Sequence, residues 1–180
     1  ISDAMKAQGF ELLGWFNVGW ANFYTKTEVR SPSELKRVKL SVGGITSPEL
    51  GKAFQRAGYT TEDVPNDKIL QSIKSANGIQ GLYTIPMYAY ASQYHKSLTY
   101  VLNTAICPVL ANFVVSEASW NNIPNQYKDD LIAAVKKTEE KFIGFQQKTD
   151  KEYLSLMEKE GLHIVNLTEK EIAVFQETLK

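Results

Sequence analysis

Aromatic and small polar side chains gather in two short parts of this sequence. The first group is Trp15, Phe16, Asn17 and Trp20. The second group consists of tyrosines, namely Tyr83, Tyr88, Tyr90, Tyr94 and Tyr100. Aromatic rings with a few polar atoms are what the wall of a buried small-molecule pocket is made of. Two interpretations fit these residues: they line a ligand pocket, or they pack the core or an exposed contact surface.

The residues that catalysis or metal binding would need form no pattern. His95 follows the tyrosine-rich run and His163 lies in a predicted strand, so we interpret both as surface or packing histidines. Motifs typical of zinc proteases, serine hydrolases, paired cysteines and phosphate-binding loops do not occur. Glu139 and Glu140 lie among lysines, as on a solvated helix face. We therefore predict no catalytic residue, no metal site and no cofactor.

Composition excludes several classes of partner. The 20 basic and 20 acidic side chains cancel, so no global field attracts nucleic acid or an anionic membrane. Cys107 is the single cysteine and makes no internal disulfide; we interpret it as a small buried hydrophobic residue. No apolar run reaches the roughly 18 to 20 residues that would span a bilayer. The chain is long enough to bury a core, as one domain or as two small lobes.

A capped helix begins near residue 31. Ser31 can accept hydrogen bonds from the following turn, Pro32 suits the first helical position, and Glu34 completes a capping-box pattern. The sequence therefore predicts a short helix from Pro32 to Lys36.

A strand follows this helix and ends where a ligand could lie. Lys39–Val42 alternates as a strand and stops at Gly43–Gly44. Because α/β proteins hold ligands at the carboxyl ends of strands, Ser41 and its neighbours are candidates for facing a ligand.

Strands and helices alternate along the chain. The predicted strands are Phe10–Phe16, Asn22–Thr25, Lys39–Val42, Thr61–Val64, Ile79–Tyr83, Leu98–Leu102, Val109–Val115 and Leu162–Val165. Helices are predicted from Ser47 to Ala57 and from Asn66 to Ser75. This order favours an α/β fold with a mostly parallel sheet.

A long helix is predicted from Pro124 to Glu160. Apolar residues recur at three or four positions in this segment, which contains no further proline. At about 1.5 Å per residue it extends on the order of 50 Å, so we expect it to bridge two lobes, with Gly144 as a bend point. A coiled-coil dimerisation helix is the alternative, although Thr138 and Thr149 interrupt its apolar stripe.

Four segments, in order along the chain, resemble a known family. They are Gly9–Trp15, Pro32–Val42, Ile123–Tyr127 and the strand Gly161–Val165. The family patterns that the first three resemble are G-x-x-x-L-G-W, P-x-D-L-K-G-x-K-I-R-V and L-P-x-x-L. The sequence resembles the solute-binding (P) subunits of tripartite ATP-independent periplasmic (TRAP) transporters, the DctP-like family, from about Gly9 to Phe175.

This resemblance implies a two-lobed, periplasmic binding protein-like α/β fold of which the chain is a C-terminal fragment. The expected parts are 1–22 in the first lobe and hinge strand, 23–97 in the second lobe, 98–123 as return strands to the first lobe, 124–160 as the bridging helix and 161–180 as a strand and helix on the second lobe. Much of the first lobe would lie upstream or on another polypeptide. Without it, the apolar faces of Phe10–Phe16 and Val109–Val115 lack cover, which predicts self-association or domain swapping.

The resemblance also implies a site that departs from the family pattern. The family arginine that binds a ligand carboxylate falls on Ser41, a second, often basic position falls near Ala21, and a family asparagine falls at or near Thr84. None of these residues carries a charge, so a simple organic acid is disfavoured. The predicted ligand-binding residues are Trp15, Phe16, Asn17, Ala21, Ser41, Asn66, Gln80, Tyr83 and Thr84.

We therefore expect an extracytoplasmic solute-binding protein, not an enzyme, that captures a neutral or hydrophobic small molecule. Segments Phe16–Ala21 and Ser97–Asn103 would act as the hinge, and ligand would favour the closed form. The expected partners are membrane permease subunits, with an accessory protein or second chain as a substitute for the first lobe, in the periplasm or on a lipid anchor facing it. Two alternatives are a protein-interaction module with little ligand binding and an enzyme with a histidine and a carboxylate converging on the cleft.

Overall fold

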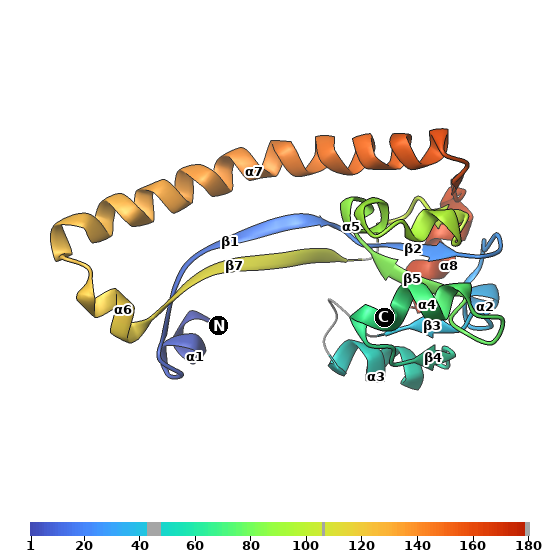
Figure 1. Cartoon of the computed structure of the whole chain (residues 1–180), viewed down its shortest axis with the longest axis horizontal. Helices are drawn as coiled ribbons and strands as arrows, with labels where there is room; N and C mark the ends of the chain where they lie inside the picture. Colours follow the sequence, from blue (N-terminus) through green and yellow to red (C-terminus); the bar gives the residue numbers. More distant parts are fainter. Residues whose placement is uncertain (43–47, 106, 179–180) are drawn as a thin grey trace. The chain divides into compact units, whose positions relative to one another are not determined.

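The computed structural model describes residues 1–42, 48–105 and 107–178. The chain divides into two compact units (Figure 1). Unit 1 comprises Ile1–Gly19 and Pro108–Thr149, and unit 2 comprises Trp20–Cys107 and Asp150–Lys180. The predicted turn at Gly43–Gly44 and the predicted helix start at Ser47 lie outside the described residues.

Unit 1 is built on a two-stranded ribbon. Strands β1 (Phe10–Trp20) and β7 (Pro108–Ser116) pair along their lengths (Figure 1). The helices of this unit are α1 (Ser2–Lys6), α6 (Glu117–Asn122) and the first part of α7 (Asn125–Lys159). Helix α7 approaches β1 closely at Gly14, where a Cβ would lie 2.5 Å from a Val135 methyl carbon.

The interior of unit 1 is small. Phe16 and Val135 are the only buried apolar side chains among its described residues. The ring of Phe16 meets Phe113 of β7 and Phe142 of α7 at centroid distances of 4.9 and 5.7 Å. The aromatic contact between the ribbon and α7 is therefore the main apolar contact that the described residues of unit 1 bury.

Unit 2 holds a six-stranded sheet in the order β4-β3-β5-β2-β6-β8. The strands are β2 (Asn22–Thr25), β3 (Leu40–Ser41), β4 (Thr61–Glu62), β5 (Gly81–Thr84), β6 (Tyr100–Leu102) and β8 (His163–Val165). Strand β3 runs parallel to β4 and β5, and β6 runs parallel to β8. Only β2 is antiparallel to its neighbours, so the expected mostly parallel sheet is confirmed.

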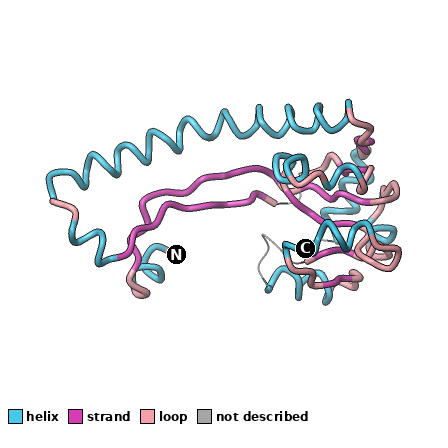
Figure 2. Tube along the Cα trace, in the orientation of Figure 1, coloured by secondary structure: helices cyan, strands magenta, loops and turns pink. Residues whose placement is uncertain are grey.

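Short helices connect the strands of unit 2, and one follows the last strand (Figure 2). They are α2 (Pro32–Leu35), α3 (Pro48–Arg56), α4 (Ile69–Lys74), α5 (Pro86–Ala91) and α8 (Glu169–Thr178), with 3₁₀ turns η1 (Asn66–Lys68) and η2 (Tyr94–Lys96). The main core joins Tyr24 and Leu82 of the sheet to Ile73 of α4, Ala89 of α5 and Met157 of α7.

The predicted cap of α2 is present with one difference. Ser31 Oγ accepts the Glu34 amide at 3.3 Å and Pro32 takes the first helical position. The Glu34 carboxylate, however, accepts the amide of Arg30 at 2.7 Å rather than that of Ser31. The reciprocal bond thus forms one residue further upstream than the capping box predicts.

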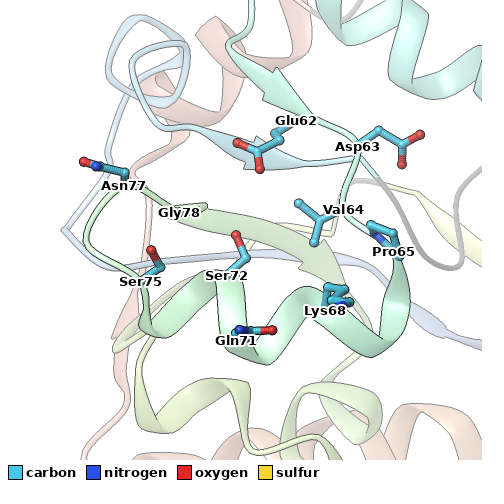
Figure 3. A pocket seen from close by; sticks show the side chains of 10 residues that line it. All are labelled: Glu62, Asp63, Val64, Pro65, Lys68, Gln71, Ser72, Ser75, Asn77 and Gly78. Carbon is cyan, nitrogen blue, oxygen red and sulfur yellow. The ribbon is translucent and has the colours of Figure 1, made fainter.

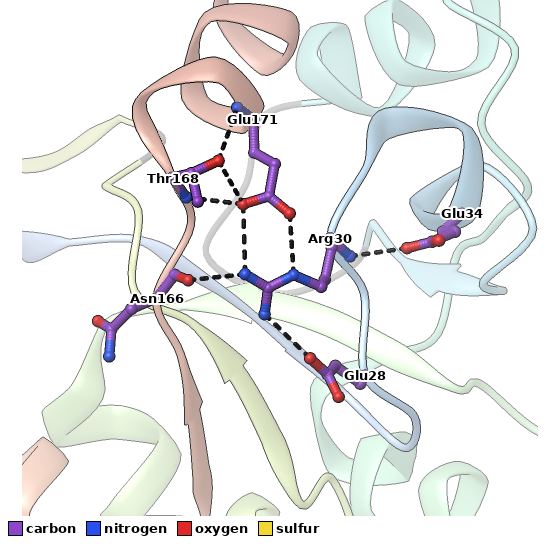
Figure 4. Close-up of polar contacts among 6 residues, drawn as sticks. All are labelled: Glu28, Arg30, Glu34, Asn166, Thr168 and Glu171. Carbon is purple, nitrogen blue, oxygen red and sulfur yellow. Dashed lines mark hydrogen bonds and ion pairs between the residues drawn. The ribbon is translucent and has the colours of Figure 1, made fainter.

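An arginine fastens helix α8 to the loop before α2 (Figure 4). Arg30 makes two bonds to the Glu171 carboxylate, from Nε at 2.8 Å and from Nη2 at 3.2 Å, and donates to the Asn166 carbonyl. Glu171 also accepts the Thr168 amide at 2.7 Å, while Thr168 Oγ1 accepts the Glu171 amide. This complete capping box and ion pair hold the pKa of Glu171 at about 2, mainly through Arg30.

Several predicted boundaries shift in the structure. Strand β1 continues to Trp20, beyond the predicted end at Phe16, and β5 begins at Gly81 rather than at Ile79. The predicted long helix is confirmed as α7, but its expected apolar stripe is incompletely covered, since Tyr127 and Phe145 are more than half exposed. Sequence periodicity locates the apolar residues of a helix but not which of them find a partner.

Candidate ligand-binding site

Small polar side chains meet at the carboxyl edge of the sheet in unit 2. Ser41 ends β3 and Thr84 ends β5, while Asn22 opens the antiparallel β2 directly opposite Thr84. Ser41 is paired with Leu82, which lies two residues before Thr84. Paired residues and alternate residues share a face of a sheet, so Asn22, Ser41 and Thr84 point to the same side.

The two hydroxyls of this set are buried without partners. Ser41 is 2% exposed and Thr84 is 3% exposed, and neither hydroxyl has a hydrogen-bond partner among the residues that the structure describes. The side-chain amide of Asn22 donates to the Leu102 carbonyl at 3.0 Å, and this bond fixes the orientation of the Asn22 side chain. A buried polar group without a partner costs about 1 to 3 kcal/mol, so these hydroxyls are suited to bonding a polar group of a ligand.

The lysine directly before β3 is already engaged. Lys39 precedes Ser41 by two residues. Its ammonium lies 3.1 Å from a Glu62 carboxylate oxygen and donates to the Asn77 carbonyl at 2.8 Å. At Ala21, near which the resemblance places a second, often basic position, the side chain is a methyl group and the residue is 2% exposed. The hydroxyl pair therefore has no adjacent counter-ion from Lys39 or residue 21.

Tyr83 lies on the opposite face of the sheet. It is paired with Phe23 of β2, and its ring contacts Phe23 and Phe54 of α3 at centroid distances of 5.9 and 5.2 Å. Phe54 also contacts Tyr59. The structure therefore places Tyr83 in an aromatic cluster with α3, whereas Thr84 beside it points to the face of Ser41.

The two remaining predicted residues of unit 2 are Gln80 and Asn66. Gln80 precedes β5, at the amino end of that strand, where its side-chain oxygen accepts the Lys39 amide at 3.3 Å. Asn66 is exposed at the start of η1. The structure does not bring Gln80 to the edge that carries Ser41.

The predicted ligand-binding residues of unit 1 make contacts within the ribbon or with the first part of α7. The Trp15 amide donates to the Glu139 carboxylate, and the Trp15 side chain is 37% exposed. Asn17 accepts the Gly19 amide at 3.0 Å through Oδ1, and Phe16 is buried against the aromatic rings described above. These contacts explain Phe16 and Asn17 as parts of the fold of unit 1.

The tyrosines of the run contact other aromatic rings of helices, turns and strands in unit 2. Tyr88 contacts Tyr94, and Tyr90 stacks on His95 and also contacts Tyr153. Tyr100 of β6 lies against His163 of β8 at 5.0 Å. These contacts favour packing, the second interpretation of these residues. The sequence did not predict that the run folds as α5 and η2.

One histidine and one carboxylate, His95 and Glu160, do lie together, in a contact that holds two parts of unit 2 to each other. The His95 ring is nearly fully buried, and its Nε2 lies 3.0 Å from Glu160, which also bonds to Lys96. The pKa of Glu160 is held at about 2, chiefly by Lys96 and then by His95. This cluster fastens η2 to the residue that follows α7.

A polar hollow of about 430 Å³ lies between β4 and α4 (Figure 3). Glu62, Asp63, Lys68, Gln71 and Ser72 are among the side chains that line it. It contains none of the predicted ligand-binding residues. Its charged lining differs from the aromatic wall that the sequence suggests.

Sequence reasoning missed Asn22 as a site residue. Its position directly after Ala21 was a usable signal, because the first residue of an antiparallel strand lies beside the last residue of its neighbour. Within the described parts of the chain, no group of three metal-ligating side chains gathers, and no helix is long and apolar enough to cross a membrane.

Solved structures of several bacterial proteins share this fold. A TRAP periplasmic solute-binding protein from Marinobacter aquaeolei VT8, in an apo open structure, matches with 22% identity and a TM-score of 0.88 over 98% of this chain and 58% of that chain. One from Pseudomonas aeruginosa PAO1 with bound L-malate matches with 18% identity and a TM-score of 0.88, over 99% and 62%. The periplasmic ectoine-binding protein of the Halomonas elongata TeaABC TRAP transporter matches with 14% identity and a TM-score of 0.87, over 99% and 58%.

This chain thus spans less than two thirds of the length of these structures. Among curated proteins, none matches significantly. The family model of the bacterial extracellular solute-binding proteins, family 7 (DctP), matches residues 1–180. The chain therefore belongs to the bacterial extracellular solute-binding protein family 7.

Proposed function

We propose that this chain is part of a periplasmic solute-binding protein of a TRAP-type transporter and that it holds a neutral or hydrophobic small molecule rather than a simple carboxylate. Family membership supports the binding role. Structures of the same fold contain L-malate, succinate or, by name, an ectoine site, so the fold accommodates more than one ligand class.

The residue at position 41 carries this proposal. The resemblance places the carboxylate-binding arginine of the family at the end of β3, where this chain has a buried serine. A guanidinium offers two parallel donors to a carboxylate, whereas a hydroxyl offers one. Burying an unpaired carboxylate costs several kcal/mol, so an acid loses much of its affinity at this position.

The remaining polar groups suit a neutral hydrogen-bonding ligand. Ser41 and Thr84 can each donate one bond or accept bonds, and both lie on the face that Asn22 shares. A carbonyl, amide or hydroxyl of a ligand satisfies such groups without bringing a charge into the protein interior.

A role in transport implies partner proteins in the membrane and a location in the periplasm. Segments Phe16–Ala21 and Ser97–Asn103 would act as the hinge, and bound ligand would favour the closed form. The closed form would then engage the membrane permease subunits. The protein would act in the periplasm, free or lipid-anchored. Since the chain covers about 58% of the first relative, the rest of the first lobe would come from further polypeptide, either its own or an accessory chain.

The test compares ligand classes on purified protein. Molecules that co-purify are identified by native mass spectrometry, and L-malate, succinate and ectoine are titrated while thermal unfolding is followed. We expect a neutral or apolar molecule to co-purify, and malate and succinate to leave the midpoint unchanged at millimolar concentration.

Two variants sharpen this test. Ser41→Arg should create stabilisation by malate, while the matched control Ser155→Arg, at an exposed position of α7, should not. Tight binding of malate or succinate by the unmodified protein contradicts the proposal. A protein that carries no molecule and responds to none supports the alternative, an interaction module.

A further inference from the structure

A carboxylate from helix α7 lies beside the start of strand β2. Asp150 belongs to unit 2, as does Trp20, and is partly buried. Its Oδ2 accepts the backbone amide of Trp20 at 3.1 Å. Two residues further along the chain, Asn22 opens β2 and is paired with Thr84. This bond therefore brings an acidic side chain, distant in sequence, to the carboxyl edge of the sheet.

Chain geometry limits the distance between this carboxylate and the edge of the sheet. Two residues of extended chain span at most about 7 Å, so the Asp150 Oδ2 atom lies within about 10 Å of the backbone nitrogen of Asn22. Charges interact over such a distance, because the screening length is about 10 Å in about 0.1 M salt and partly buried charges are screened less. A ligand group beside Asn22 and Thr84 is thus within range of Asp150.

The charge of Asp150 also acts on Tyr24 of β2. Tyr24 and Ser41 are both paired with Leu82, from opposite sides, so they share one face of the sheet. Burial first, and then the charge of Asp150, raise the pKa of the Tyr24 hydroxyl well above its ordinary value. The negative field of Asp150 therefore reaches the face of the sheet that carries Ser41.

The neighbouring groups do not cancel this field. Lys39 is paired with Glu62 at 3.1 Å, so these two residues together add little net charge. Ala21 directly follows Trp20 and is uncharged, although the resemblance places an often basic position near it. The Trp20 amide is a neutral donor, which orients the Asp150 carboxylate and leaves its charge in place. Together, these groups give the carboxyl edge a negative charge.

We propose that Asp150 is a specificity-determining residue, whose negative charge excludes anionic molecules from the carboxyl edge of the sheet in unit 2. The proposal rests on the proposed function, because it requires a small molecule to bind beside Ser41 and Thr84. A ligand carboxylate at this edge finds no guanidinium and also meets a like charge, so attraction is absent and repulsion is added. The ligand class is thereby narrowed to molecules whose end near α7 is uncharged or positively charged.

Removal of this charge from a variant that binds L-malate tests the proposal. Asp150→Asn keeps a side-chain oxygen that can accept the Trp20 amide and removes only the charge. In a Ser41→Arg background, Asp150→Asn should lower the dissociation constant of malate about threefold or more in about 20 mM salt. The gain should shrink in about 0.5 M salt, because salt screens the charge. Glu152→Gln, exposed on the opposite side of α7, makes the same change in net charge and should leave malate binding unchanged.

A thiol at position 41 measures the same field without any ligand. In a chain with Ser41→Cys and Cys107→Ser, the introduced thiol is titrated by the ultraviolet absorbance of its thiolate. Asp150→Asn should raise the acid dissociation constant of this thiol about threefold, since a thiolate is no longer repelled, and Glu152→Gln should not.

Equal effects of Asp150→Asn and Glu152→Gln in either measurement overturn the role of Asp150 and leave the proposed function unaffected. An effect of Asp150→Asn on malate binding that salt does not alter also overturns it. Tight binding of malate by the unmodified protein contradicts both the role of Asp150 and the proposed function.

Discussion

Among the polar side chains of unit 2, some have a hydrogen-bond or ion-pair partner within the described residues and others have none. Arg30 and Glu171 satisfy each other and fix α8, while the hydroxyls of Ser41 and Thr84 are buried with no described partner. The first arrangement is what stability requires of polar groups, and the second costs free energy. Buried polar groups that fold stability does not explain are the best markers of function in this chain.

The Arg30–Glu171 contact predicts a pH dependence of stability. Because the folded pKa of Glu171, about 2, lies below the ordinary value of 4.5, the contact stabilises the fold fully above about pH 4.5. This stabilisation is lost as pH falls from about 4.5 to about 2. Urea unfolding at several pH values should therefore show a shallower acid dependence for Glu171→Gln than for the unmodified chain. Glu169→Gln, on the same helix, should retain the steeper dependence.

At the scale of elements, glycines show where backbones approach one another. A Cβ at Gly78 would lie 1.8 Å from the Ser72 carbonyl oxygen, so the turn between α4 and β5 depends on that glycine. A Cβ at Gly144, inside α7, would meet nothing within 4 Å. The predicted bend point thus has no steric need for glycine.

These two positions predict opposite effects of alanine. Gly144→Ala should stabilise α7 by about 0.5 to 1 kcal/mol, because alanine is the better helix former. Gly78→Ala should destabilise unit 2 by about 1 to 3 kcal/mol, since the turn must move to admit the methyl group. Urea unfolding followed by circular dichroism measures both, and stabilisation by Gly78→Ala would contradict the structure of this turn.

At the scale of the whole molecule, the two units differ in how much they bury. Unit 2 joins strands and helices around a continuous core, whereas unit 1 depends on Phe16, Val135 and a two-stranded ribbon. Backbone amides exchange according to the free energy of local opening, which follows burial.

Hydrogen exchange should therefore separate the units. Amides of β7, whose residues are largely exposed, should exchange at least tenfold faster than those of β2 and β5. Peptides from the two strand sets, compared by mass spectrometry, provide the measurement. Equal protection of β7 and β5 would show that unit 1 has a core of its own.

The sequence by itself determined the local elements. The cap at Ser31 and Pro32, the strand Asn22–Thr25 and the long helix were predicted from neighbouring residues, because capping and periodicity act over a few positions. Family motifs placed Ser41 at a strand end, and the structure puts it there.

Only the tertiary structure decided which side chains share a surface. Pairing of Asn22 with Thr84 and of Phe23 with Tyr83 sends Thr84 and Tyr83 to opposite faces, and the sequence contains no local sign of that register. The tyrosine run and His95 likewise acquired their partners from α7 and the residue after it, far along the chain. Strand register and long-range packing arise from the sum of many weak contacts, so no short segment encodes them.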